Sequence, residues 1–400
     1  MVCKSFGICG GCSLKQDGYS AQIKLKQGKV KALLEPFYNG EIEVTPSPNT
    51  EYFRNKIELS FCRQVVWSEP YGKKKKVVRD KTKPLEFENT FGFRLKGRWD
   101  RCVNIEDCLL YEPNLSAYAK ALRLWAEEKK LSFYDQRTHE GLLRNLILRR
   151  GVNTGEGMAV LITAAPFEHA EDFAKLTETF YPSYHILTAV NDGVSDGAGI
   201  KDIRIVKGKG FIREKILESG REIIFEISPQ SFFQTNTKAA NLIYEKVASK
   251  MAELKPAVMY DFYGGAGSFS LCCAPYVGKS LCVESVPSAV NDGVRNAKIN
   301  KIENVNFFCA TTEDFLAKNK IGSHNSVIVL DPPRSGVHPA ACAKILNSGA
   351  PQIFYVSCNP ATLAENLKTL SAKYKVTHVE CFDFFPHSEH IETLAELELK

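Results

Sequence analysis

The pattern of apolar and polar positions changes near residue 236. After a helical stretch over 236–252, short apolar runs bounded by turn signals alternate with amphipathic stretches such as 286–299 and 339–346. The runs are VMYDFYG, SLCVES, VNFFCA, VIVLD and IFYVSC. This alternation predicts a mainly parallel, doubly wound α/β sheet. The tail departs from it, because KVTHVECFDFF and HIETLAELEL predict two consecutive strands and hence an antiparallel final hairpin.

The residues before 228 do not show this strand–helix alternation and follow other hydrophobic patterns. Residues 19–37 predict a basic amphipathic helix, and the aromatic and β-branched stretch from 52 to about 104 predicts hairpins of an antiparallel sheet. From 141 to about 227, apolar runs alternate with helical stretches as in an α+β module. We therefore expect three parts: an N-terminal segment with one helix (1–50), a central α+β domain (51–227) and an α/β domain (228–400).

Composition places the chain among globular proteins. Its 400 residues suggest two or three domains, and 44% of them are hydrophobic, which is enough for sizeable cores. The sequence has no N-terminal signal-type stretch and no apolar run that approaches the length of a membrane span. We expect a cytoplasmic protein with no membrane partner, and no obligate protein partner is evident.

The net charge of +6 is unevenly distributed. Residues 1–110 hold 20 Lys and Arg against 13 Asp and Glu, whereas the remainder holds 32 against 33. The excess comprises Lys73 to Lys76, Arg79, Lys81, Lys83, Arg94, Lys96, Arg98 and Arg101. A local basic excess indicates a polyanionic partner, most often a nucleic acid. The alternative is a solvated basic loop that binds nothing.

Thirteen cysteines are many for a chain that we place in the cytoplasm, where disulfides are rare. Cys3, Cys9 and Cys12 form a glycine-rich C-x5-C-x2-C pattern that predicts metal ligation. Cys108 is the natural fourth ligand, with Cys102 as the alternative. Four thiolates suit zinc or an iron–sulfur cluster, and one tight trio with a distant fourth cysteine is nearer to cluster usage.

A glycine loop follows the first strand of the α/β domain. The strand runs through Asp261 and Tyr263 into Gly264-Gly265-Ala266-Gly267, and Glu284 lies twenty positions beyond Gly264 at the end of the next strand. Such glycines let the backbone approach a ligand, and the acid can accept hydrogen bonds from ribose hydroxyls. This spacing predicts an adenosine-bearing cofactor. Ser270 at the third-glycine position, like the final hairpin, favours S-adenosylmethionine over NAD.

Two further strands are expected to end side by side, one at Asp331 and one at Cys358. Asn359 and Pro360 predict a helix cap and the first helical residue directly after the thiol. The positive end of that helix should lower the pKa of Cys358 and favour the nucleophilic thiolate. The alternative is a buried structural cysteine.

A thiol nucleophile beside a methyl donor limits the kinds of atom that the enzyme is expected to methylate. It is unnecessary for an amine target but useful for carbon 5 of a pyrimidine, because addition of the thiolate at carbon 6 makes carbon 5 nucleophilic. A base must then remove the carbon 5 proton, and Glu392 is the candidate. Arg334 in DPPR replaces the aromatic residue that methyltransferases acting on amino groups often place there.

At this point the chain closely resembles the RNA 5-methyluridine methyltransferase family, whose members use S-adenosylmethionine. The matching motifs are SFFQTN, DFYGGAGSFS, LDPPRSG, SCNPATLAENL and HSEHIE, together with the four cysteines. The resemblance implies a Rossmann-like class I methyltransferase domain, an RNA substrate, Cys358 as nucleophile and Glu392 as base. It also implies cofactor contacts from Gln234, Tyr263, Ser268, Glu284 and Asp331, and a [4Fe–4S] cluster on Cys3, Cys9, Cys12 and Cys108.

The substrate and the exact reaction stay open within this interpretation. The cysteine trio starts at residue 3, which leaves no room for the RNA-binding TRAM barrel of many members. The chain therefore resembles the shorter members that act on 23S ribosomal RNA, and a tRNA T-loop uridine is the main alternative substrate. A cytosine 5-methyltransferase and a non-catalytic, cluster-bearing RNA-binding or redox-sensing protein are two further interpretations of the same residues.

Overall fold

The computed structural model describes residues 3–14, 18–66, 85–195, 199–322 and 324–400. The chain forms two compact units: unit 1 comprises Met1–Ser13 and Glu51–Ile212, and unit 2 comprises Leu14–Thr50 and Arg213–Lys400. The predicted N-terminal segment is thus divided between them, with the cysteine trio in unit 1 and the helix in unit 2. The basic run 73–76, with Arg79, Lys81 and Lys83, lies outside the described residues.

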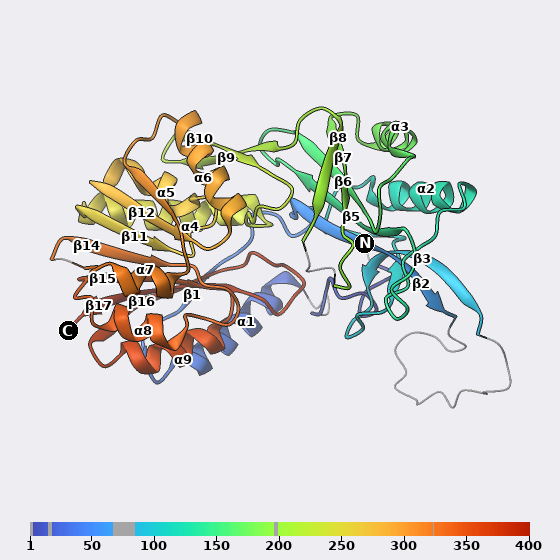
Figure 1. Ribbon diagram of the computed structural model, residues 1–400. Helices are drawn as coiled ribbons and strands as arrows, with labels where there is room; N and C mark the ends of the chain where they lie inside the picture. Colours follow the sequence, from blue (N-terminus) through green and yellow to red (C-terminus); the bar gives the residue numbers. More distant parts are fainter. Residues whose placement is uncertain (1–2, 15–17, 67–84, 196–198, 323) are drawn as a thin grey trace. The chain divides into compact units, whose positions relative to one another are not determined.

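Unit 2 contains the predicted α/β sheet (Figure 1). Its eight strands follow the order β1-β16-β17-β15-β14-β11-β12-β13. The strands are β1 (Glu43–Thr45), β11 (Val258–Phe262), β12 (Lys279–Glu284), β13 (Val305–Cys309), β14 (Ser326–Leu330), β15 (Gln352–Ser357), β16 (Tyr374–Phe382) and β17 (Glu392–Leu399). Strands β11 to β15 are parallel, and β17 is antiparallel to β15 and β16, which confirms the predicted final hairpin. The short edge strand β1, parallel to β16, was not predicted.

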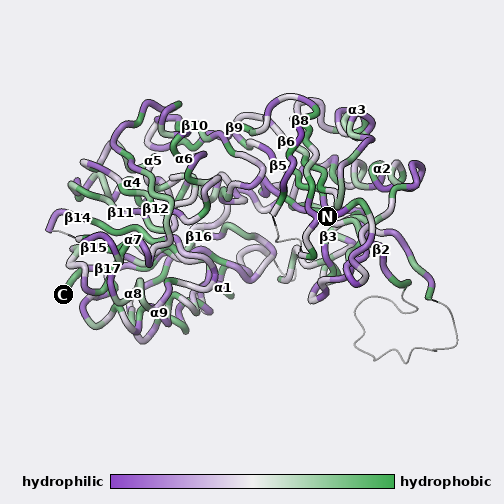
Figure 2. The backbone as a smooth tube through the Cα atoms, viewed as in Figure 1, coloured by the Kyte–Doolittle hydropathy of each residue, from purple (hydrophilic) through white to green (hydrophobic). Residues whose placement is uncertain are grey.

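Helices cover both faces of this sheet (Figure 1). One face shares a core with α1 (Tyr19–Leu34), α7 (Thr312–Lys318), α8 (Pro339–Leu346) and α9 (Pro360–Leu370). The others are α4 (Thr237–Leu254), α5 (Ser268–Cys273), the 3-10 turn η2 (Ala274–Tyr276) and α6 (Pro287–Ile299). Helix α5 packs on β11 and β12, and α4 packs on α5 and β16. Helix α6 packs on β12 and on β10 (Arg221–Ile227), which forms a separate hairpin with β9 (Ile212–Glu218). Figure 2 shows the alternating apolar and polar stretches along the chain that this layering requires.

Unit 1 is built on a seven-stranded sheet of order β4-β3-β2-β5-β6-β7-β8. Its elements are β2 (Lys56–Val65), β3 (Phe87–Arg94), β4 (Cys102–Asn104), α2 (Leu115–Glu128), β5 (Leu143–Arg150), β6 (Gly157–Thr163), α3 (Ala170–Phe180), β7 (Tyr184–Val190) and β8 (Lys201–Lys207). All strand pairs are antiparallel except β6 with β7. Helices α2 and α3 share one apolar core with the sheet, as the α+β prediction requires. In the part of the chain that the structure describes, no helix is long and apolar enough to cross a membrane.

Helix α1 is held to the rest of unit 2 by polar as well as apolar contacts. Its buried residues Gln22, Lys26, Val30 and Leu34 are four positions apart and share one face. The Lys26 ammonium, fully buried, donates to Asp383 Oδ1 at 2.6 Å and to the Phe385 carbonyl at 3.0 Å. The basic amphipathic helix is therefore present, but two of the four residues on its buried face are polar, and one is charged.

Removing one member of this buried ion pair should be costly. We expect Lys26→Ala to lower the free energy of unfolding by about 3–5 kcal/mol, because Asp383 keeps a buried charge without its cation. Urea unfolding measures this. Lys24→Ala, at an exposed position of the same helix, is the control and should change it by less than about 0.5 kcal/mol. Equal effects of the two substitutions would show that the pair does not stabilise unit 2.

Candidate active site

Strand register brings the predicted thiol and acid together. Strand β17 pairs antiparallel with β15, with Ser357 opposite Thr393, so Cys358 and Glu392 are the next residues at that edge. Asp331 directly follows β14, which is parallel to β15. All three lie within electrostatic range of one another. The structure therefore assembles these candidates at one edge of the unit 2 sheet.

The Cys358 thiol differs from the expectation. Helix α9 begins at Pro360, and the Asn359 side chain accepts from the Ala361 amide at 3.2 Å, as predicted. Burial, with smaller contributions from Glu392 and Asp331, nevertheless raises the pKa of Cys358 to about 11. The expected lowering by the helix end is thus wrong for the ligand-free protein, because loss of hydration and two neighbouring acids outweigh it. Cys358 is a protonated thiol at neutral pH.

Glu392 is the most deeply buried of the three groups. It is 2% exposed, and its Oε2 has no hydrogen-bond partner among the described residues. Burial, and then the charge of Asp331, raise its pKa well above the ordinary value, while Arg334 opposes the shift. A buried carboxyl group with an unused oxygen next to a thiol is suited to accepting or returning a proton.

Two aspartates, Asp261 (buried) and Asp331 (half-buried), complete a group of acids with little access to solvent. Burial, followed by the charge of Asp261, raises the pKa of Asp331 to about 7, although a hydrogen bond from Gln234 opposes this. Burial raises the pKa of Asp261 itself to about 6; its Oδ2 accepts from the Ser270 hydroxyl at 2.6 Å, and its Oδ1 has no partner among the described residues. Neighbouring carboxyls that resist ionisation together fit a cationic ligand, which would restore their charge.

The glycine loop is ordered around Glu284. Gly265 and Gly267 have φ values of 56° and 82°, which favour glycine. Glu284 Oε2 accepts from the Gly265 amide at 3.0 Å, and its Oε1 accepts from the Val286 amide at 2.8 Å and the Ser285 hydroxyl at 3.2 Å. The predicted acid is thus placed beside the loop, with acceptor capacity left on Oε2.

The remaining predicted contacts surround the same strand ends. Tyr263 has a φ of 62°, rare for a bulky residue, and its hydroxyl hydrogen-bonds Thr312. Ser268 opens α5 and hydrogen-bonds the buried hydroxyl of Tyr244 on α4. The sequence did not indicate Tyr244 as a residue of the site, because it lies at one of the regularly spaced buried positions of α4, where an aromatic side chain normally only packs in the core.

The four predicted metal ligands gather in unit 1. Burial, and then the thiols Cys9, Cys108 and Cys3, raise the pKa of Cys12 to about 12. Cys102, the alternative ligand, lies in a separate buried network, with its sulfur 3.1 Å from Thr90 Oγ1 and 3.2 Å from the Ser60 carbonyl. Among the described residues, no three His, Cys, Asp or Glu side chains are arranged closely enough to hold a metal ion as they stand. Thiolates are the donor type that a soft metal centre takes, and the four thiols lie within electrostatic range of one another.

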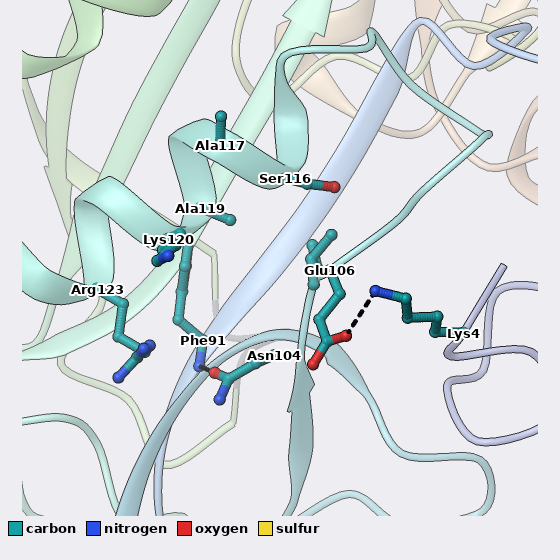
Figure 3. Close-up of a pocket in the computed structure, with 10 residues that line it drawn as sticks. Lys4, Phe91, Asn104, Glu106, Ser116, Ala117, Ala119, Lys120 and Arg123 are labelled. Carbon is teal, nitrogen blue, oxygen red and sulfur yellow. Dashed lines mark hydrogen bonds and ion pairs between the residues drawn. The ribbon is translucent and has the colours of Figure 1, made fainter.

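A cavity of about 450 Å³ in unit 1 contains none of the predicted residues (Figure 3). Lys120 and Arg123 of α2 line it, and Lys4 faces Glu106 across 3.5 Å. Three cations and one acid among its lining residues make it a positively charged cavity.

A doubly wound sheet with an antiparallel closing hairpin, a glycine loop and an acid at the end of the second strand defines the methyltransferase class. The sequence model of the tRNA (Uracil-5-)-methyltransferase family matches residues 197–399. A protein of Bacteroides thetaiotaomicron named as an uncharacterized RNA methyltransferase is 34% identical, over 100% of this chain and 87% of that one. The tRNA (uracil(54)-C(5))-methyltransferase of Pyrococcus horikoshii is 32% identical, over 99% and 85%.

A solved structure agrees with these relatives. The crystal structure of Pyrococcus abyssi tRNA (uracil-54, C5)-methyltransferase in complex with S-adenosyl-L-homocysteine superimposes with a TM-score of 0.73 and 27% identity, covering 98% of this chain and 86% of that one. The chain therefore belongs to the RNA uracil-5-methyltransferase family. It is an enzyme with an RNA substrate, and family and fold support S-adenosylmethionine as the cofactor. The family resemblance is confirmed, and the interpretation as a non-catalytic protein is wrong.

The raised pKa of Asp331 predicts a pH-dependent stability. A carboxyl whose folded-state pKa is about 7 favours folding at low pH, and this contribution disappears as pH rises from about 4 through 7. We expect Asp331→Asn to stabilise the ligand-free protein at pH 8, by on the order of 1–3 kcal/mol, and to have little effect near pH 4. Urea unfolding at both pH values tests this, with the exposed Glu365→Gln as control. A loss of stability at pH 8 would contradict the assignment.

Proposed function

We propose that this enzyme transfers a methyl group from S-adenosylmethionine to carbon 5 of a uridine in RNA through a covalent adduct on Cys358. The observation that carries the proposal is the buried Glu392, with an unpartnered Oε2, at the strand edge next to the Cys358 thiol. A thiol and a proton acceptor at neighbouring positions are the two groups that substitution at carbon 5 of a pyrimidine needs.

The protein's residues act in sequence on the pyrimidine ring. Cys358 gives its proton to solvent and its Sγ bonds to carbon 6, which moves the electrons of the carbon 5–carbon 6 double bond toward carbon 5 and oxygen 4. Carbon 5 would then take the methyl group of S-adenosylmethionine, and the electron pair of the broken methyl–sulfur bond would stay on sulfur, leaving S-adenosylhomocysteine. The Glu392 carboxylate removes the remaining proton from carbon 5, the double bond reforms, and the bond between carbon 6 and Sγ breaks. The thiolate recovers a proton, so each turnover releases one proton to solvent.

The raised pKa values favour this order of events. A carboxylate that binds protons tightly is a strong base once it is ionised, which suits Glu392 for removing a proton from carbon. A cation bound among the acids would ionise them. Arg334 lies within electrostatic range of both Cys358 and Glu392 and opposes the rise in the pKa of each, so it favours the anionic forms that the reaction requires.

For the cofactor we propose contacts from Gln234, Tyr263, Ser268, Glu284 and Asp331. The buried acids fit the positive charges of S-adenosylmethionine, and Glu284 beside the glycine loop fits its ribose hydroxyls. Gln234 donates to Asp331 and orients its carboxylate. These roles come from the family resemblance together with the contacts described above.

For the metal centre we propose a [4Fe–4S] cluster on Cys3, Cys9, Cys12 and Cys108. The mutual electrostatic range of the four thiols supports this set, and the separate network of Cys102 favours Cys108 as the fourth ligand. Such a cluster would supply a cross-link between the N-terminal segment and the loop after β4, and a redox centre.

For the substrate we propose a uridine of 23S ribosomal RNA, because the sequence resembles the shorter family members that act on this RNA. A tRNA uridine is the second candidate, and a specific observation favours it: the similar proteins from three Pyrococcus species are named tRNA (uracil-54) enzymes.

Two substitutions separate the catalytic roles. We expect Glu392→Gln to accumulate a covalent RNA–protein adduct on a denaturing gel, because the carbon 5 proton can no longer be removed. Cys358→Ala should form no adduct and lose methylation by at least about 10³-fold, while S-adenosylmethionine still binds in calorimetry. Turnover by Cys358→Ala would exclude it as the nucleophile, and absence of adduct from an RNA-bound Glu392→Gln variant would assign the base elsewhere.

Nucleoside mass spectrometry tests the overall proposal. Unmodified 23S ribosomal RNA and tRNA transcripts are incubated separately with the enzyme and S-adenosylmethionine, and we expect 5-methyluridine in the ribosomal transcript. The same product in tRNA alone would keep the chemistry and replace the substrate. 5-Methylcytidine in place of 5-methyluridine would overturn the proposed target base.

A further inference from the structure

The turn over residues 95–101 of unit 1 presents a tryptophan to solvent. Trp99 is 65% exposed. A single exposed apolar side chain is ordinary on a protein surface, so this exposure alone has no functional meaning. What distinguishes Trp99 is that the backbone carrying it is fixed by several independent contacts.

Hydrogen bonds close the turn on itself. The Leu95 amide donates to the Arg101 carbonyl and the Arg98 amide to the Leu95 carbonyl, both at 2.9 Å. The Arg94 guanidinium donates to the carbonyl of Trp99 at 2.7 Å. The position of the indole is therefore set before any ligand binds, which lowers the entropic cost of binding.

A buried carboxylate next to the tryptophan holds two arginines. The Asp100 side chain is 3% exposed and accepts from Arg98 at 2.8 and 2.9 Å and from Arg137 Nε at 2.8 Å. Burial alone would raise the pKa of Asp100, but these guanidinium groups hold it well below its ordinary range. The acid is thus charged at physiological pH and fixes both guanidinium groups at the residue that follows Trp99.

The cysteine segment holds the other side of the turn. Gly10 donates its amide to the Arg94 carbonyl and Lys96 donates its amide to the Ile8 carbonyl, both at 2.9 Å, so Cys9 and Leu95 form an antiparallel bridge. Cys9, Leu95 and Val103 also form a small buried cluster. Backbone hydrogen bonds and a shared apolar cluster therefore connect two segments directly: the one that carries the proposed cluster ligands Cys9 and Cys12, and the turn that carries Trp99.

The surroundings of the indole are cationic. Lys96 is exposed, and the side chains of Arg98 and Arg137 are 34% and 57% exposed, against the single buried acid Asp100. A fixed, exposed aromatic ring among cations is suited to stacking on an unpaired nucleobase while the cations contact the phosphate backbone. A protein partner would need an apolar patch, and the neighbours of Trp99 in this turn are charged.

We propose that Trp99 stacks on an unpaired base of the RNA substrate, and that the Cys9 segment holds the turn in the geometry for stacking. The inference rests on the proposed function in one respect, that the substrate is RNA. It assigns to the cysteine segment a role in RNA recognition, separate from the chemistry at Cys358.

RNA binding by two Trp99 variants tests the inference. The probes are a short oligouridylate, a duplex of the same length, and the RNA that the wild-type enzyme methylates. We expect Trp99→Ala to weaken single-strand binding about 5- to 100-fold, in line with the energy of one stacked base, and to leave duplex binding nearly unchanged. Trp99→Phe should retain most of the affinity, and Leu124→Ala, an exposed apolar residue of α2, is the matched control.

Fluorescence gives a readout independent of activity. The chain has three tryptophans, and a stacked base should quench Trp99, so quenching by oligouridylate should be lost in Trp99→Phe. Unchanged affinity of Trp99→Ala for both single-stranded RNAs would overturn the inference and leave the proposed function intact if methylation continues. Wild-type binding without methylation would contradict the proposed function, while the Trp99 comparison would still decide the inference. Wild-type protein that binds no RNA would overturn both.

Discussion

The pairing of β17 with β15 is the constraint on which the candidate site depends. Parallel strands place their carboxyl ends at one edge, so Asp331 and Cys358 would meet there in any doubly wound sheet. The antiparallel β17 adds its first residue to the same edge, and that residue is Glu392. A thiol, an acid and a candidate base from three separate segments are thereby held by backbone hydrogen bonds rather than by flexible loops.

The same arrangement explains the electrostatics of the site. Carboxyls confined behind a sheet edge lose hydration and raise the pKa of one another and of the thiol. In the ligand-free protein the Cys358 thiol is therefore protonated at neutral pH, and the carboxyls ionise at a higher pH than ordinary carboxyls do. A cation bound at this edge would favour the ionised forms of all these groups. Binding of the positively charged methyl donor would therefore prepare the thiol and the base for the proposed reaction on the substrate.

The sequence predicted much of the fold and part of the site. The α/β alternation and the final hairpin were recognisable because strands buried on both faces are short apolar runs. The pKa of Cys358 was not predictable, because the helix cap is a local signal whereas the opposing acids come from elsewhere in the chain. The burial of Lys26 was not predictable either, because a lysine among the basic residues of α1 normally lies on a solvated face. Its partner Asp383 is 357 positions away in the sequence.

That separation has a consequence for the order in which the protein is made. Both units are discontinuous in sequence, but the larger part of unit 1, residues 51–212, leaves the ribosome as an uninterrupted stretch that can fold while translation continues. Helix α1 emerges earlier but must wait for Asp383, roughly 20 to 70 s at a synthesis rate of about 5–20 residues per second. During that interval the nascent chain carries the Trp99 turn without the thiol–acid pair, so the proposed stacking on RNA would become possible before methylation does.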